Sequence, residues 1–150
     1  MADGNRVEDL TDAQRRLQSE LMDTRTALLL IAHGSRQDSA NDDLRDLAGR
    51  LASVGDYTIV EPSFLELAEP GILEAGRRCV ERGASLVLML PYFLSAGVHL
   101  KRDLTSARDE LAAEHPAVAF RLGPPLGPHP LLDRLVVERV KEMGTPELGS

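Results

Sequence analysis

The sequence predicts one α/β domain in which four parallel strands alternate with helices in the order βαβαβαβα. Continuous apolar runs at 27–32 and 85–90 are typical of strands that are buried on both faces of a parallel sheet. Between such runs lie longer segments whose apolar residues recur at helical spacing. Strands that alternate with helices favour three layers, with the sheet between two layers of helices.

Length and composition restrict the classes of protein that this sequence can encode. The chain has 150 residues, of which 43% are hydrophobic, enough to form the core of one domain. Only 3% of the residues are aromatic and there is no tryptophan, which argues against stacking platforms for nucleobases. The net charge of -7 and the pI near 5.1 also disfavour a nucleic-acid partner. An anionic small ligand stays compatible with this charge, because basic groups can gather locally.

Each predicted strand is an apolar run with a clear end. The first run stops at a polar turn after Ala32. Pro62 is expected to break the second strand near its end, because proline has no backbone N–H to donate. Pro91 ends the third strand. Four strands are therefore expected, at 26–32, 57–64, 85–90 and 118–122.

The helices that follow the strands are marked by signals at their ends. Asp38 or Ser39 is expected to cap the first of them, and Gly55 follows its end. Pro70 suits the first turn of the second helix, and Gly83 suits its C-terminal cap. The third helix is broken by a His-Pro pair. The helices are expected at 38–54, at 70–82, up to residue 114, and at 131–143.

The two ends of the chain are expected to lie outside the domain. Residues 1–25 form a predicted peripheral leader, partly disordered or with a short helix capped by Thr11 and Gln14. The predicted domain covers residues 26–143, and residues 144–150 are a predicted disordered tail.

The cellular compartment is expected to be the cytoplasm. The chain has one cysteine, Cys79, which excludes an intramolecular disulfide and suits a reducing compartment. We expect it to be a small buried hydrophobic residue. The sequence has no apolar run of transmembrane length, and its N-terminus lacks the pattern of a signal peptide. No membrane partner is expected.

Three residues with metal or proton chemistry follow three successive strands. His33, Glu66 and His99 are equally spaced along the sequence. A βαβ unit needs about 30 residues or more, so each of the three falls at the same edge of the sheet, one unit further along. Open α/β sheets bind ligands at this edge, beyond the carboxyl ends of the strands. Two imidazoles and a carboxylate there can bind a divalent first-row metal or act as acid and base, whereas solvated polar turns are the alternative.

Several other kinds of site are disfavoured. Neither phosphate-binding glycine motif occurs, and there is no H-E-x-x-H motif or cysteine cluster for a structural zinc ion. Ser35 has no G-x-S-x-G elbow around it, so a serine hydrolase is not expected. His115, at a helix end, is expected to be structural, and His129 is a weak ligand candidate. A phosphoryl-transfer enzyme with His33 as nucleophile is disfavoured, since no arginine precedes the His-Gly pair.

Four motifs follow one another along the chain. They are His33-Gly34-Ser35-Arg36, Ser63-Phe64-Leu65-Glu66, the segment from Pro91 to Asp103 with Gly97 and His99, and the segment from Leu126 to Pro130. Together they resemble the sirohydrochlorin chelatase family of class II chelatases, and most closely its short, single-domain CbiX type. The resemblance covers roughly residues 26–140 and leaves out the leader. It departs from the family at Leu104-Thr105, where an apolar-Pro pair is more usual.

The resemblance implies a chelatase, a lyase that inserts cobalt or iron, and in some members nickel, into a sirohydrochlorin-type tetrapyrrole without ATP. Its product would serve cobalamin or siroheme synthesis. His33 and His99 would hold the metal and take up pyrrole protons, and Glu66 would be a third ligand or proton acceptor. Apolar, hydroxyl and basic residues near the histidines are expected to contact the tetrapyrrole, although ordinary surface charge is an equal alternative for the basic ones. These residues are Ser35, Arg36, Tyr92, Phe93, Leu94, Ser95, Lys101 and Arg102.

The same resemblance implies an assembly. A single βαβαβαβα unit corresponds to one lobe of a bilobal chelatase, and short members pair as homodimers with the site between the lobes. A homodimer is therefore expected, although the sequence does not show which surface pairs. A non-catalytic carrier of tetrapyrrole or metal with the same fold is the alternative to an enzyme. The choice of metal, of tetrapyrrole and of pathway stays open.

Overall fold

The computed structural model describes residues 11–16 and 25–144 and confirms the α/β fold with alternating strands and helices. The strands are β1 (Thr26–Ala32), β2 (Ile59–Phe64), β3 (Leu86–Pro91) and β4 (Ala119–Leu122). The helices are α2 (Asp38–Val54), α3 (Ile72–Glu81), α4 (Val98–Glu114) and α5 (Pro130–Glu142).

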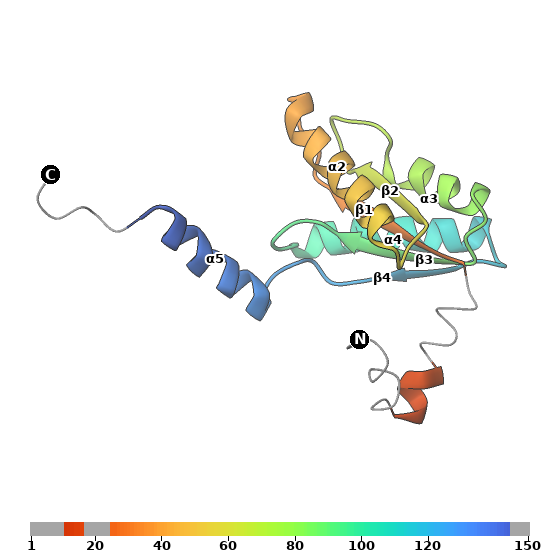
Figure 1. The fold of residues 1–150 in the computed structure, drawn as a ribbon. Helices are drawn as coiled ribbons and strands as arrows, with labels where there is room; N and C mark the ends of the chain where they lie inside the picture. The colour runs from red at the N-terminus through yellow and green to blue at the C-terminus, as the bar shows by residue number, and fades with distance from the viewer. Residues whose placement is uncertain (1–10, 17–24, 145–150) are drawn as a thin grey trace, which may run out of the picture.

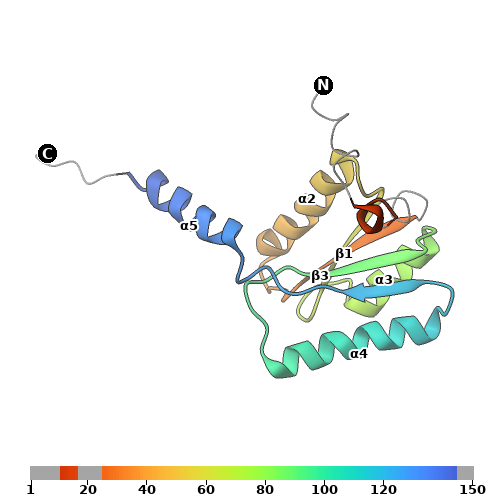
Figure 2. The same cartoon turned by 90° about the horizontal axis from the view of Figure 1, so that it is seen from below.

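The four strands form one parallel sheet in the order β2-β1-β3-β4. Strand β1 lies in the interior, where Ala27 is aligned with Ile59 of β2 on one side and with Val87 of β3 on the other. Helix α2 covers one face of the sheet, while α3 and α4 cover the opposite face (Figures 1 and 2). The predicted three-layer arrangement is therefore confirmed.

Side chains of β1 alternate between two apolar cores. Leu29 and Ile31, both fully buried, pack in the core beneath α3 and α4. Leu28 and Leu30 pack in the core beneath α2, together with Leu44 of that helix. This alternation explains why the whole of the first strand is apolar, since both of its faces are covered by helices.

Strand β2 differs from the prediction at Pro62. The strand begins at Ile59 rather than at residue 57, and it continues through Pro62, which is aligned with Leu30 of β1. The expected break is therefore wrong. Strand β2 is an edge strand, where a residue without an N–H does not interrupt hydrogen bonds on both sides.

The predicted caps of α2 and α3 are correct at the ends of these two helices and wrong at their starts. Gly55 ends α2 with φ of 112°, and Gly83 follows α3 with φ of 98°, both in the left-handed region that favours glycine. At the start of α2, Gln37 is the cap residue and no side chain caps the helix, so neither Asp38 nor Ser39 does so. Pro70 precedes Gly71, the cap of α3, and lies outside the first turn.

Helix α5 is placed differently from the other helices. It extends away from the sheet at the end of the chain (Figures 1 and 2). All of its residues are described and none of them is buried. Its apolar side chains are exposed instead, among them Leu135 at 46% and Val136 at 62%. Amphipathic patterning predicted this helix, but none of the residues that the structure describes buries its apolar face.

The described part of the leader contains the expected capping box. The backbone N–H of Thr11 donates to Gln14 Oε1 at 2.9 Å, and the N–H of Gln14 donates to Thr11 Oγ1 at 3.2 Å. The rest of the predicted leader up to residue 24, and the predicted tail from residue 145, lie outside the described residues. In the part of the chain that is described, no helix is long and apolar enough to cross a membrane.

Candidate functional site

The carboxyl ends of β1 and β3 mark the position of the candidate site. From β1 the chain turns to α2 on one face of the sheet, and from β3 it turns to α4 on the opposite face (Figure 2). Adjacent strands whose connections leave in opposite directions form a topological switch point, where open α/β sheets bind ligands. The loops after β1, β2 and β3 therefore lie at the edge of the sheet where the metal ligands predicted from the sequence are expected.

His33 is the first residue after β1, and its exposed imidazole rests on Phe93. The two ring centroids are 4.7 Å apart and the ring planes are tilted by 36°. The N–H of Tyr92 donates to the carbonyl of Ile31 at 2.6 Å, which joins the loop after β3 to the end of β1. Phe93 itself is only 9% exposed. Its ring therefore supports the His33 ring, and little of its own surface faces solvent.

Glu66 is joined to His33 through the backbone. The N–H of Glu66 donates to the carbonyl of His33 at 3.1 Å, so the parallel pairing of β1 and β2 continues into the two loops. Gly34 has φ of 92°, and a Cβ atom there would lie 1.8 Å from the carbonyl oxygen of Glu66. Only glycine fits this contact. The two loops can approach this closely because residue 34 has no side chain.

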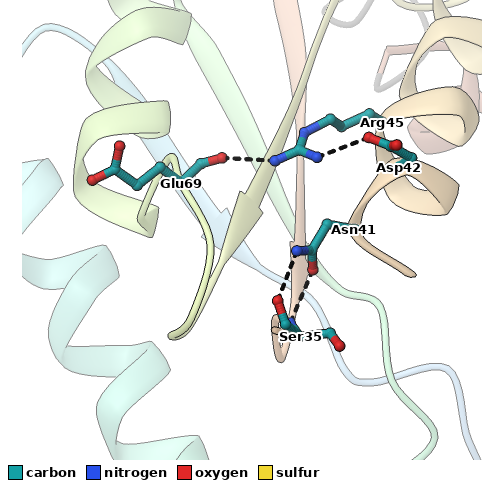
Figure 3. Close-up of polar contacts among 5 residues, drawn as sticks. All are labelled: Ser35, Asn41, Asp42, Arg45 and Glu69. Atoms are coloured by element: carbon teal, nitrogen blue, oxygen red, sulfur yellow. Dashed lines mark hydrogen bonds and ion pairs between the residues drawn. The ribbon is translucent and has the colours of Figure 1, made fainter. Parts of the chain in front are cut away.

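Ser35 is held from α2 by a residue that sequence analysis missed. Asn41 is a buried polar residue at 2% exposure, and its amide makes two hydrogen bonds to the backbone of Ser35 (Figure 3). One signal was present in the sequence, because Asn41 lies three and seven residues before Leu44 and Ala48, on the buried face of the helix. A polar residue on an apolar face needs a hydrogen-bond partner.

His99 lies in the first turn of α4, after the cap residue Gly97, and it is exposed. Exposed apolar side chains lie before it in the same segment. Tyr92 is 41% exposed, Leu94 66% and Val98 72%. These three side chains are accessible, whereas Phe93 is largely buried. Their contact with a tetrapyrrole stays a prediction.

The expected basic and hydroxyl residues are accessible. Arg36, Lys101 and Arg102 are exposed, and none of them forms an ion pair with another described residue. Ser95 is exposed as well. The Oγ of Ser35 accepts a hydrogen bond from the N–H of Gln37 at 3.1 Å and keeps its own proton to donate.

The three predicted metal ligands are not gathered into one cluster. Within residues 11–16 and 25–144, no group of three or more His, Cys, Asp or Glu side chains is placed to hold a metal ion. His33 and Glu66 lie in adjoining loops, whereas His99 belongs to the helix on the opposite face from α2. Two facing loops and a helix start thus present separate donors at one edge of the sheet.

The other residues with reactive side chains have structural surroundings. His129 Nδ1 accepts a hydrogen bond from the N–H of Leu131 at 3.0 Å and so caps α5. His115 is the cap residue at the end of α4, and its N–H donates to the carbonyl of Leu111 at 3.0 Å. Cys79 is fully buried, and loss of hydration raises the pKa of its thiol to about 12.

Comparison with known proteins decides the family. The family model described as CbiX matches residues 27–143. The chain belongs to the CbiX family. The resemblance to sirohydrochlorin chelatases that the four motifs indicate is thereby confirmed.

Relatives of this CbiX chain carry chelatase names and differ in length. The chloroplastic sirohydrochlorin ferrochelatase of Arabidopsis thaliana is 36% identical over 76% of this chain and 51% of its own. The sirohydrochlorin cobaltochelatase of Priestia megaterium is 36% identical over 78% of this chain and 38% of its own. The chain therefore spans about half or less of these two proteins. The sirohydrochlorin cobaltochelatase of Methanopyrus kandleri is 30% identical over 77% of this chain and 95% of its own.

Solved structures share the fold of this CbiX chain. A CbiX protein from Marinobacter aquaeolei VT8 aligns with a TM-score of 0.67 and 31% identity, over 79% of this chain and 96% of that one. The chelatase SirB from Bacillus subtilis subspecies spizizenii, in complex with cobalt, aligns with a TM-score of 0.72 and 28% identity, over 79% of this chain and 51% of that one. Our chain thus corresponds to about half of SirB.

Proposed function

We propose that this CbiX protein is a chelatase that inserts cobalt or iron, as divalent ions, into sirohydrochlorin or a related tetrapyrrole. Nickel is a third candidate metal, and no nucleotide takes part. The names of the relatives support the substrate and the two principal metals. The product would serve cobalamin or siroheme synthesis.

One observation carries the proposal: the exposed imidazole of His33 is presented at the switch point of the sheet by the ring of Phe93. Metal insertion must remove two pyrrole protons and deliver a partly desolvated cation. A neutral imidazole suits both tasks, since the ordinary pKa of imidazole is about 6.5. We assign this role to His33 and His99, and we assign to Glu66 the role of a further ligand or proton acceptor.

The tetrapyrrole needs an apolar surface for its ring and cations for its carboxylates. Tyr92, Leu94 and Val98 supply exposed apolar surface in the segment that leads to His99. Arg36, Lys101 and Arg102 form no ion pair with another residue in the described part of the chain, so they are available for charge-assisted hydrogen bonds to carboxylates. Ser35 and Ser95 can add hydroxyl contacts. Phe93 acts on the ligand through His33, because its own ring is buried.

The experiment is anaerobic metallation of sirohydrochlorin, followed by its absorbance, with cobalt, iron and nickel in turn. Wild type is compared with His33→Ala, His99→Ala and Glu66→Gln, and with His129→Ala as a matched histidine control outside the site. We expect turnover above the uncatalysed rate without ATP, lost in the two site-histidine variants and retained in His129→Ala. If the wild type binds the tetrapyrrole but does not accelerate metal insertion, the chelatase hypothesis is contradicted. The alternative, a non-catalytic carrier, is then favoured.

We also propose that the protein works as a homodimer. The apolar face of α5, which includes Leu135, Val136 and Val140, is exposed, and the helix extends away from its own sheet (Figure 1). The alignment with SirB covers 51% of that protein. A second copy that covers α5 would remove this apolar surface from water.

Sedimentation analysis tests the assembly. We expect a dimer for the wild type and a monomer for Val136→Glu, with Glu138→Gln on the same helix as the control. A monomeric wild type at micromolar concentration would contradict the homodimer.

We also propose that the protein is located in the cytoplasm, a reducing compartment that suits its single free cysteine. Detection of the protein only in a membrane fraction would contradict this location.

A further inference from the structure

Asn41 ties the first turn of α2 to the loop that carries His33. Its Oδ1 accepts a hydrogen bond from the N–H of Ser35 at 2.9 Å, and its Nδ2 donates to the carbonyl of Ser35 at 2.8 Å (Figure 3). The side chain of Asn41 therefore holds both the backbone N–H and the backbone carbonyl of Ser35. Because Asn41 is 2% exposed and Ser35 is half-buried, removal of the Asn41 amide leaves the backbone of Ser35 without these two partners.

Arg45 ties the next turn of α2 to the loop that carries Glu66. Its guanidinium lies over the ring of Phe64, 5.2 Å from the centroid. Its Nη2 donates to the carbonyl of Glu69 at 3.2 Å (Figure 3). Phe64 is the last residue of β2, and its N–H donates to the carbonyl of Pro70 at 2.9 Å. Arg45 therefore contacts the loop at its start and near its end. Asp42 holds Nη1 of the same guanidinium at 2.9 Å.

The two ties converge on one pair of loops. Asn41 and Arg45 are four residues apart and so share a face of α2. The loops that they hold are already joined to each other, because Glu66 donates to His33 and Gly34 packs against Glu66. The side chains of His33 and Glu66 are themselves exposed, so their positions depend on how firmly the backbone beneath them is held.

We propose that Asn41 and Arg45 are positioning residues of the site, which fix the His33 and Glu66 loops in one geometry from successive turns of α2. Neither residue needs to touch the metal or the tetrapyrrole. For its effect on catalysis the inference rests on the proposed metal insertion. An error of about 1 Å in the placement of reacting groups can cost roughly 100-fold in rate, so a loosened loop is expected to lower kcat.

Two measurements on Asn41→Ala and Arg45→Met test the proposal. In hydrogen exchange, the amide of Ser35 is expected to exchange faster in Asn41→Ala, and the amides of 64–69 faster in Arg45→Met, while β3 keeps its protection. In cobalt insertion, both variants are expected to lose about 10-fold or more in kcat, whereas KM for sirohydrochlorin changes by less than about twofold.

Two control variants lie on the same helix. Arg50→Met removes an exposed arginine that does not hold a loop, and Ala48→Gly lowers helix stability by about 1 kcal/mol without removal of a side-chain hydrogen bond. Both are expected to keep kcat within about twofold of wild type. The proposal is overturned if exchange in the two loops is unchanged, or if Ala48→Gly loses as much kcat as Asn41→Ala.

The two proposals can fail separately. If the wild-type protein does not accelerate metallation, the proposed function fails, while hydrogen exchange still shows whether α2 holds the two loops. If the wild type is active and both positioning variants are as active as Arg50→Met, the positioning role fails and the chelatase assignment stands.

Discussion

Helices α2 and α5 are both amphipathic in sequence, but only α2 buries side chains in the structure. Each follows a strand and carries apolar residues at helical spacing. Helix α2 buries Leu44 and Ala48 against β1 and β2 and makes side-chain hydrogen bonds to two loops. Helix α5 buries none of its residues. An amphipathic pattern therefore shows that one face of a helix needs a cover, but not which surface supplies it.

The connections to the two helices explain the difference. Five residues separate β1 from α2, and Asn41 holds this turn against the helix. The connection to α5 is a proline-rich segment that is tied to the loop after β3. There Leu126 and Gly127 donate to the carbonyls of Phe93 and Leu94, each at 3.0 Å. These bonds direct the chain along the carboxyl edge of the sheet, and α5 begins beyond that edge.

The largest expected effect contrasts the two apolar faces. Leu44→Ala should lower the free energy of unfolding by about 2–5 kcal/mol, because Leu44 is 2% exposed and leaves a cavity in the core. Leu135→Ala, on the exposed face of α5, should cost far less within one chain. Denaturant unfolding at two protein concentrations separates the cases. An equal loss in both variants would mean that α5 packs on its own sheet.

Concentration dependence sharpens this contrast. In a homodimer joined through α5, the unfolding midpoint of the wild type rises with protein concentration, whereas that of Leu135→Glu does not. Leu44→Ala should keep the concentration dependence of the wild type, since α2 belongs to the folded chain itself. A wild-type midpoint that ignores concentration would argue against pairing through α5.

The next effect contrasts two glycines, one in the loop before α2 and one within α2. Gly34→Ala is expected to destabilise the protein by more than about 1 kcal/mol and to abolish metal insertion, since its Cβ meets the Glu66 carbonyl at φ of 92°. Gly49→Ala, within α2 and with open space around it, should stabilise by about 0.5–1 kcal/mol. Thermal unfolding and the metallation assay measure both. An active, stable Gly34→Ala would refute the close approach of the loops.

A smaller effect is expected in acid, away from both helices. The guanidinium of Arg77 donates two hydrogen bonds to the carboxylate of Glu114, at 2.9 and 2.7 Å. These bonds lower the pKa of Glu114. The contribution to stability is therefore present above the pKa of the unfolded carboxyl and is lost as the pH falls through the folded value. Arg77→Met should unfold more easily than wild type at pH 7 and equally easily near pH 2. A difference between the two that persists unchanged into strong acid would exclude this linkage.

The smallest expected effect is at Cys79. Burial raises the pKa of its thiol to about 12, so the thiolate that reacts with alkylating agents is scarce at neutral pH. Iodoacetamide should leave the folded protein unlabelled at pH 8 and label it fully in denaturant. Rapid labelling of the native protein would show that α3 opens more readily than its packing indicates.

Local patterns were sufficient to predict most of the secondary structure. The ends of β1 and α2 agree with the sequence prediction, because an unbroken apolar run and the glycine after Val54 are signals that act within a few residues. Pro62 misled the prediction, since its effect depends on whether β2 is central or at the edge. Whether a strand lies at an edge depends on the order of all strands in the sheet, so it cannot be predicted from the sequence of that strand alone.

The sequence by itself determined that His33, Glu66 and His99 would follow three strands of one parallel sheet, because parallel strands end at the same edge. Only the tertiary structure decided that β1 and β3 are neighbours, that Phe93 lies beneath His33, and that α5 leaves the sheet. The physical reason is range. Helical hydrogen bonds, turns and the periodicity of apolar residues act between near neighbours in the chain, whereas strand pairing, strand order and packing join residues far apart in it.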